Sequence, residues 1–108
     1  MTTFYDYDGN PIPQHVWVEL NYRAGRIVAT TSLSDPRGRK WDVITMWLGV
    51  NLDPIAGTPQ IYETRIAEKH DTAAQEPYTS ARVRHLYATR TQAVAGHNRA
   101  TRRIAHTE

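Results

Sequence analysis

The sequence predicts an α+β fold: a small antiparallel β-meander of about four strands with a C-terminal helix packed on one sheet face. Residues 26–50 contain two apolar, β-branched segments separated by a turn at residues 34–38, which is typical of a hairpin. Residues 60–67 and 82–88 continue the alternation of apolar and polar side chains that favours strands. Residues 90–105 place apolar side chains at helical spacing and follow threonines that can cap a helix.

The chain of 108 residues is expected to form a single domain, residues 1–108, because this length supplies one hydrophobic core. Residues 1–12 form an N-terminal arm or strand that ends near the turn pair Asp8-Gly9. Residues 68–80 are polar and show little periodicity, so we expect a mobile loop there.

The strand at residues 40–50 carries apolar side chains on both faces, which indicates a central strand. We expect one face to present Val43, Thr45 and Trp47, and the other Trp41, Ile44, Met46 and Leu48. A single helix covers only one face of a sheet. The second face therefore predicts self-association, a possible homo-oligomer.

The C-terminal helix is expected to bury one stripe and expose a basic face. The predicted stripe consists of Ala93, Val94, His97, Ala100, Thr101 and Ile104. The predicted exposed face carries Gln92, Arg99, Arg102 and Arg103.

The net charge of +2 is unevenly distributed. Residues 1–81 carry seven basic and ten acidic side chains, whereas residues 82–108 carry six arginines and only Glu108 as an acid. A basic C-terminal region can attract acidic partners, including nucleic acid. The alternative, a solvated helix face, is favoured because arginine is a good helix former and helix C-termini favour positive charge. The candidate binding surface consists of Arg82, Arg84, Arg90, Arg99, Arg102 and Arg103.

The composition excludes several classes of site. The chain has no cysteine, so disulfides, thiolate zinc sites and iron–sulfur clusters are excluded. Its apolar segments are far shorter than the roughly 20 residues of a membrane helix, and its acidic, aromatic N-terminus is unlike a secretory signal. We expect no membrane partner and a cytoplasmic protein.

Four short motifs stand in order along the chain: Asp8-Gly9-Asn10-Pro11-Ile12, Trp47-Leu48-Gly49, Tyr62-Glu63-Thr64, and Ala93-Val94-Ala95-Gly96-His97. In this order, and with Trp17, they resemble a family of small uncharacterised proteins of actinobacterial bacteriophages, over roughly residues 5–98. The family has no assigned chemistry, and the arginine-rich end of this chain departs from its pattern. Residues 13–22 fit either a strand or a helix by their spacing, and the resemblance implies a short N-terminal helix.

Glu63 and His97 form a candidate polar pair. His97 lies on the apolar stripe of the predicted helix, and Glu63 lies in the strand beneath it. A carboxylate that meets an imidazole is the minimal unit of general acid–base catalysis. The alternatives are a half-buried histidine with one structural hydrogen bond, and a glutamate paired with Arg65 or another arginine on an exposed sheet face.

The chain lacks the other parts of a catalytic or metal site. No serine stands in a glycine-flanked nucleophile elbow, so we predict no catalytic residues and no enzyme activity. The remaining histidines show no ligand spacing, and we predict no metal and no cofactor: His15, His70, His85 and His106.

The tryptophans Trp17, Trp41 and Trp47 are candidate aromatic anchors for the core or for an interface. The resemblance and the lack of a catalytic constellation favour a non-enzymatic phage accessory protein, located in the host cytoplasm, that binds a host or phage macromolecule. A host-directed inhibitor or anti-defence factor is the first version of this hypothesis. A nucleotide or nucleic-acid binding module that uses the basic C-terminal region, and a minor virion or assembly protein, are the alternatives.

Overall fold

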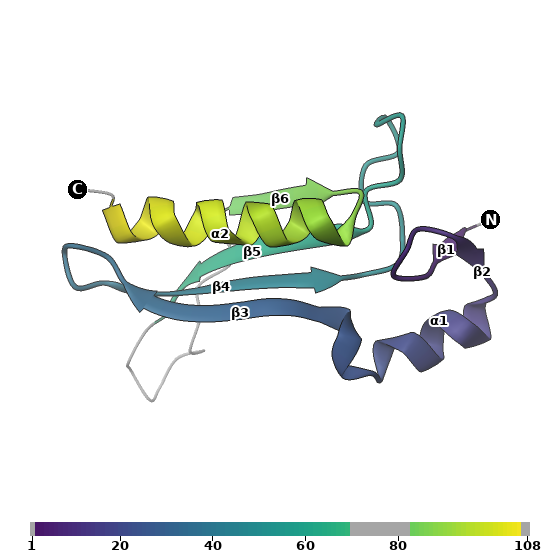
Figure 1. The fold of residues 1–108 in the computed structure, drawn as a ribbon, viewed down its shortest axis with the longest axis horizontal. Helices are drawn as coiled ribbons and strands as arrows, with labels where there is room; N and C mark the ends of the chain where they lie inside the picture. The colour runs from purple at the N-terminus through teal and green to yellow at the C-terminus, as the bar shows by residue number, and fades with distance from the viewer. Residues whose placement is uncertain (1, 70–82, 107–108) are drawn as a thin grey trace.

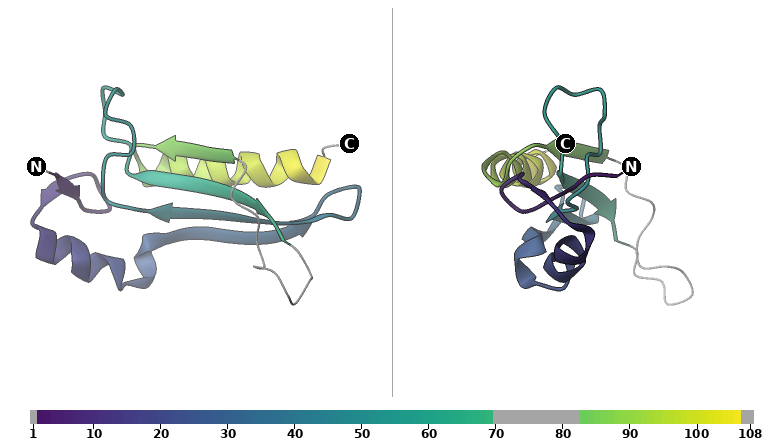
Figure 2. Two further views of the ribbon diagram at one scale, coloured as in Figure 1. Left: turned by 180° about the vertical axis from the view of Figure 1, so that it is seen from behind. Right: turned by 90° about the vertical axis from the view of Figure 1, so that its right-hand side faces the viewer.

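A computed structural model describes residues 2–69 and 83–106 (Figure 1). The predicted α+β class is confirmed, because four antiparallel strands form one sheet in the order β3-β4-β5-β6, with helix α2 against it. The bounds are β3 (Ile27–Ser34), β4 (Lys40–Trp47), β5 (Tyr62–Glu68), β6 (Val83–Tyr87) and α2 (Arg90–His106). Helix α2 contacts all four strands and covers one face of the sheet (Figure 2).

The N-terminal segment forms a small unit beyond one end of this sheet. Its two-residue strands β1 (Phe4–Tyr5) and β2 (Pro11–Ile12) pair in antiparallel fashion, and helix α1 (Gln14–Asn21) follows Pro13. A short 3-10 helix, η1 (Ala24–Arg26), leads into β3. The structure therefore gives a helix where the spacing of residues 13–22 allowed two interpretations. Pro13 is its N-cap residue, with extended backbone, and its carbonyl accepts hydrogen bonds from the N–H groups of Val16 and Trp17 (both 3.1 Å).

Two of the predicted side-chain placements are wrong. Trp41 lies on the helix-covered face, against the cluster of Val43, Ile66 and Ala100, and not beside Ile44. Residues two apart in a strand share a face, so Trp41 follows Val43. In α2, Val94 is exposed and Gly96 is buried in the stripe instead, where it packs closely against Tyr87 of β6.

The expected loop boundary is also shifted. Strand β5 continues to Glu68, since Trp41 of β4 pairs with Glu68 across the sheet. Most of the predicted loop, from residue 70 to residue 80, lies outside the described residues, as does Arg82.

The core between α2 and the sheet consists of two apolar clusters. The cluster near the N-terminal unit contains Trp47, Ile61, Tyr62, Tyr87 and Ala93, and the second contains Val43, Ile66 and Ala100. All three residues of the second cluster come from different elements, so it joins β4, β5 and α2.

Gly96 allows α2 to approach β6. A Cβ atom placed on Gly96 would overlap the hydroxyl and ring of Tyr87, which is itself buried. A larger residue would force the helix away from the strand or the tyrosine out of its site.

We expect Gly96→Ala to lower the free energy of unfolding by about 1–3 kcal/mol, through overpacking against Tyr87. In an unobstructed helix the same substitution stabilises by about 1 kcal/mol, so the sign of the effect is diagnostic. Urea denaturation measures it. Gly57→Ala is the matched control, because a Cβ atom added there would have no other atom within 4 Å, and it should be nearly neutral. A Gly96→Ala protein as stable as the parent would contradict the close approach.

Asp35 organises the turn between β3 and β4. Its carboxylate accepts hydrogen bonds from the backbone N–H of Arg37 (2.9 Å) and of Arg39 (3.0 Å). It also accepts from Arg39 Nε (3.0 Å) and from the indole Nε1 of Trp41 (3.0 Å). The hydrogen bond from the Trp41 indole is the largest influence and lowers the pKa of Asp35. Burial acts next and raises it, and the donors of Arg39 and then Arg37 lower it further, so that the pKa falls from 3.8 to about 2.

Stability that depends on an Asp with a lowered pKa is present above the unfolded value of 3.8 and is lost as the pH falls through about 2. We therefore expect Asp35→Asn to be less stable than the parent at pH 5. The difference should shrink between about pH 4 and pH 2 as the parent carboxylate is protonated. Thermal unfolding followed by circular dichroism across this range measures it, with the exposed Asp8→Asn as control. A difference that does not change with pH would rule out the carboxylate as its source.

Candidate functional site

A groove runs between β6 and α2 and has a volume of about 340 Å³. Arg99 and Arg103 lie four residues apart on one helix face and line it from α2, while His85 lines it from β6. The apolar side chains of the lining are those of Ile66, Tyr87, Ala100 and Ile104, and Gly96 also borders it. Leu86 adjoins the groove, although its pairing with Glu63 places its side chain on the other face of β6. In the described part of the chain β6 pairs with β5 alone, so the groove follows an edge of the sheet.

The predicted basic surface is divided by the sheet. Arg99 and Arg103 line the groove, Arg102 is exposed elsewhere on α2, and Arg84 belongs to the opposite face of β6. Arg90, at the start of α2, donates from NH1 to the Gly25 carbonyl (2.9 Å). The sixth arginine, Arg82, lies outside the described residues.

The predicted contact between Glu63 and His97 is wrong, because the two side chains lie on opposite faces of the sheet. Thr64, the residue after Glu63, bonds to Thr45, which bonds to His97 under the helix. Neighbouring residues of a strand point to opposite faces, so Glu63 faces away from α2. The sequence did not show whether the odd- or the even-numbered residues of β5 face the helix, since both faces of that strand carry apolar and polar residues.

Glu63 binds two arginines on the face that α2 leaves uncovered. Its carboxylate accepts hydrogen bonds from Arg65 Nε and from Nε and NH2 of Arg84. The Glu63 side chain is fully buried, whereas those of Arg65 and Arg84 are 49% and 53% exposed. This agrees with the alternative of a glutamate–arginine pair. The predicted binding surface does not include Arg65, although its place two residues after Glu63 is the signal for it.

His97 is enclosed by three threonines from three strands. Its Nε2 lies 2.8 Å from Thr31 Oγ1, and its Nδ1 lies 2.8 Å from Thr45 Oγ1. Thr45 Oγ1 lies 2.5 Å from Thr64 Oγ1. A neutral imidazole has one donor and one acceptor nitrogen, so the chain of bonds runs in one direction from β3 through α2 to β5. Burial lowers the pKa of His97 below its usual 6.5, which keeps the ring neutral.

The three tryptophans are all held within the fold through their indole N–H groups. Trp17 donates to the Leu48 carbonyl (2.9 Å), Trp47 to the Asp6 carbonyl (3.1 Å), and Trp41 to Asp35. Trp47 is fully buried, and the other two are partly buried. These contacts assign the tryptophans to the core and not to an exposed binding surface.

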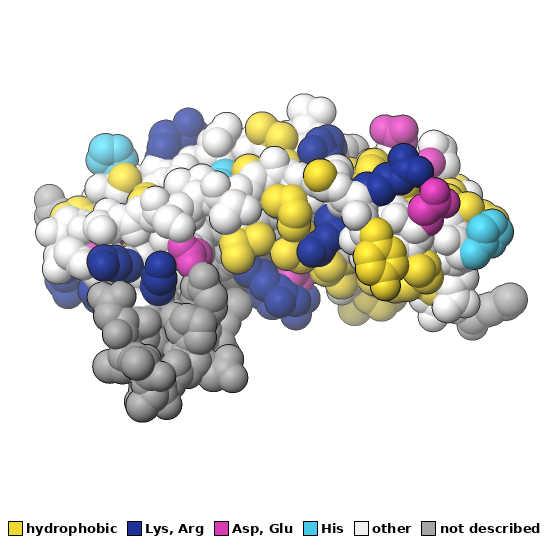
Figure 3. Space-filling view, turned by 90° about the horizontal axis from the view of Figure 1, so that it is seen from below, with side chains coloured by type: hydrophobic (Ala, Val, Ile, Leu, Met, Phe, Trp, Pro, Cys, Tyr) yellow, Lys and Arg dark blue, Asp and Glu magenta, His cyan; other side chains and the backbone are white. Residues whose placement is uncertain are grey.

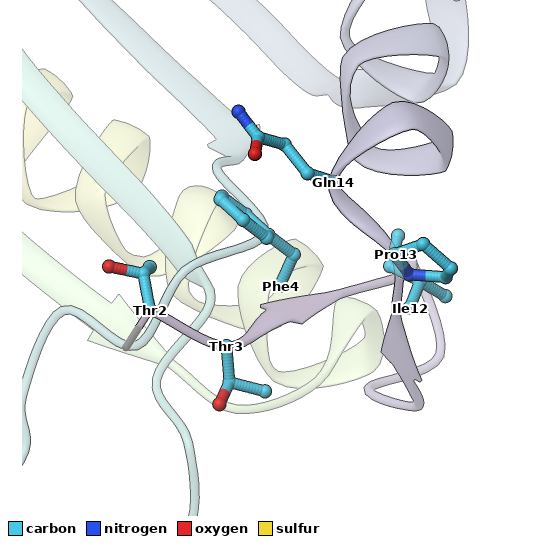
Figure 4. Close-up of a pocket in the computed structure, with 6 residues that line it drawn as sticks. All are labelled: Thr2, Thr3, Phe4, Ile12, Pro13 and Gln14. Carbon is cyan, nitrogen blue, oxygen red and sulfur yellow. The ribbon is translucent and has the colours of Figure 1, made fainter.

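A second cavity, about 680 Å³, lies beside the N-terminal unit and is lined by Thr2, Thr3, Phe4, Ile12, Pro13 and Gln14 (Figure 4). None of these side chains is charged, so the cavity offers little for recognition of a charged ligand.

In the view of Figure 3, hydrophobic side chains gather at the α1 end, and Lys and Arg are scattered along the length. The exposed Tyr22 and Val18 belong to this end.

Within residues 2–69 and 83–106, no group of three or more histidines, cysteines or acids is placed to hold a metal ion. No helix in that part of the chain is long and apolar enough to cross a membrane. Comparison with protein-family models, with curated proteins and with solved structures finds no match.

We expect stability to depend on pH through His97. A histidine with a lowered folded pKa stabilises the fold above the unfolded value of 6.5, and this stability falls as the pH drops from 6.5 to the folded pKa. His97→Gln should lose about 1–3 kcal/mol at pH 7.5, because it leaves buried threonine hydroxyls short of partners.

The His97→Gln protein should also show a smaller loss of stability than the parent between pH 7 and pH 5. Urea denaturation at several pH values measures both effects. His15→Gln, on the exposed surface of α1, should keep the slope of the parent. An unchanged slope in His97→Gln would assign the pH dependence to other groups.

Proposed function

We propose that the protein is a non-enzymatic accessory protein of a bacteriophage that binds an acidic segment of a host or phage protein. The observation that carries this proposal is the groove between β6 and α2, where Arg99 and Arg103 stand over an apolar floor. The phage setting, and action in the host cytoplasm as an inhibitor or anti-defence factor, rest on the motif resemblance.

The composition of the groove favours a protein over other partners. Arginine beside aromatic and aliphatic side chains is common at the centres of protein interfaces, because the guanidinium and its apolar stem both contribute. Tyr87, Ile66 and Ile104 provide the apolar contribution here. Within the described residues β6 is an edge strand, and its backbone groups are then a place where an extended peptide can bind.

A non-enzymatic role agrees with the surroundings of His97. Both ring nitrogens are bonded to threonines inside the core, so the imidazole is not placed to exchange protons with a substrate. Glu63, the carboxylate that the sequence suggests as its partner, is bound by Arg65 and Arg84 instead.

Nucleic acid is the second candidate, favoured by the three exposed arginines in the later turns of α2: Arg99, Arg102 and Arg103. Phosphate contacts by such residues weaken steeply as salt rises. The apolar lining of the groove and the small net charge of +2 favour the protein partner over this candidate.

Affinity capture from host cells, with the tagged parent and two variants, tests the proposal. We expect the parent and Arg23→Ala to retain a specific host or phage protein, and Arg99→Ala to bind it about tenfold more weakly in a titration of the purified pair. Arg23 is the matched control, since it loses the same charge from an exposed ion pair with Glu19.

Equal binding by Arg99→Ala would contradict the role of the groove. Captured material that disappears on nuclease treatment, or that is released by moderate salt together with DNA, would favour the nucleic-acid candidate.

A further inference from the structure

The face of the sheet that α2 does not cover carries a second charged cluster, formed by Glu63, Arg65 and Arg84. It lies on the opposite face of β6 from the groove, so it is a separate feature. Its carboxylate is fully buried, while about half of each arginine side chain is exposed. The cluster therefore has a buried anionic base and a cationic outer surface, with a net charge of +1.

The strand register brings the two arginines together. Arg65 of β5 and Arg84 of β6 are directly opposite each other in the sheet. Like charges in this position repel, and Glu63 offsets the repulsion by binding both. One carboxylate oxygen accepts from Arg65 Nε, and the other accepts from Arg84 Nε (2.8 Å) and NH2.

These bonds orient the guanidinium groups without using all of their donors. Among the described residues, the polar contacts of Arg65 and Arg84 are with Glu63 alone. Both terminal nitrogens of Arg65 and NH1 of Arg84 are engaged in none of these bonds. Since the carboxylate already restricts both side chains, a ligand that binds these donors loses less conformational entropy than it would on two free arginines.

The neighbouring side chains strengthen this site. Ile44 stands beside Arg65 in the same cross-strand row, and Met46 and Leu86 flank Glu63 in the next row. Apolar neighbours lower the local dielectric constant and so increase the attraction for an anion. Asp42, an acid of β4 on the same face, is buried and accepts a hydrogen bond from the Ser32 hydroxyl (Oγ to Oδ1, 2.5 Å).

We propose that Arg65, Arg84 and Glu63 form an oxyanion-binding site, which takes a phosphate or carboxylate group of a ligand. The two arginines contact the oxyanion, and Glu63 is a positioning residue that holds them at a fixed separation. Planar guanidinium groups bind such oxygens in pairs, which a lysine ammonium does not do.

The experiment is a titration of the uniformly 15N-labelled protein with inorganic phosphate, followed by NMR of the arginine Nε–H signals. We expect the signals of Arg65 and Arg84 to move and to saturate, while that of Arg23 stays in place. Arg23 is a matched reference, because it is also exposed and also paired with a glutamate, Glu19. Parallel titrations with sulfate and acetate separate a preference for phosphate-like anions from a preference for carboxylates.

Arg65→Lys keeps the charge and leaves Arg84 bound to Glu63, so the fold should persist, which thermal unfolding checks. We expect this variant to bind the preferred anion at least about tenfold more weakly. If the NMR signals of all arginines shift and the shifts grow without saturation, the result shows an adventitious ion only and overturns the proposal. An affinity of Arg65→Lys for the anion equal to that of the parent would also overturn it. Arg99→Ala should leave the titration unaltered, so failure of the groove and failure of this site are distinguishable.

Discussion

The hydrogen bonds of His97 connect the helix to most of the sheet. The imidazole contacts Thr31 on β3 and Thr45 on β4, and Thr45 continues the chain to Thr64 on β5. Unpaired polar groups in such a place would each cost about 1–3 kcal/mol, so the network constrains the position and rotation of α2 more strictly than apolar packing alone. The two apolar clusters lie on either side of it and fill the remaining space.

The position of α2 in turn defines the groove. With His97 fixed over the centre of the sheet, Gly96 faces Tyr87 of β6 at very close range. The next turns of the helix then carry Arg99 and Arg103 along the β6 edge. A rotation of α2 by one residue would move these arginines away from His85. The groove between β6 and α2 is thus a consequence of the buried network, although it shares no residue with it.

The sequence was sufficient for the strands of the main sheet and for α2, and insufficient for α1 and for the contacts between elements. Alternation in β3, β4 and β5, and helical spacing in α2, identified the elements because each pattern is local. The predicted contact between Glu63 and His97 was wrong because it depends on whether the odd- or the even-numbered residues of β5 face the helix. Long-range packing decides this, here because Tyr62, Thr64 and Ile66 enter the core. The error over Trp41 was different in kind, since its spacing from Val43 already placed both on one face.

The cluster around Glu63 contributes less to the stability of the sheet than apolar side chains at the same positions would. A fully buried carboxylate has lost its hydration, and its bonds to Arg65 and Arg84 only compensate for that loss. Apolar side chains like the neighbouring Met46 and Leu86 would stabilise the same position without this cost. Local arrangements that sacrifice stability are concentrated at functional sites. The half-exposed guanidinium groups form a fixed pair of cationic donors that face outward. Apolar side chains at these positions would not provide such donors. For this reason we propose an anionic ligand, rather than a second copy of the chain, for the face of the sheet that α2 does not cover.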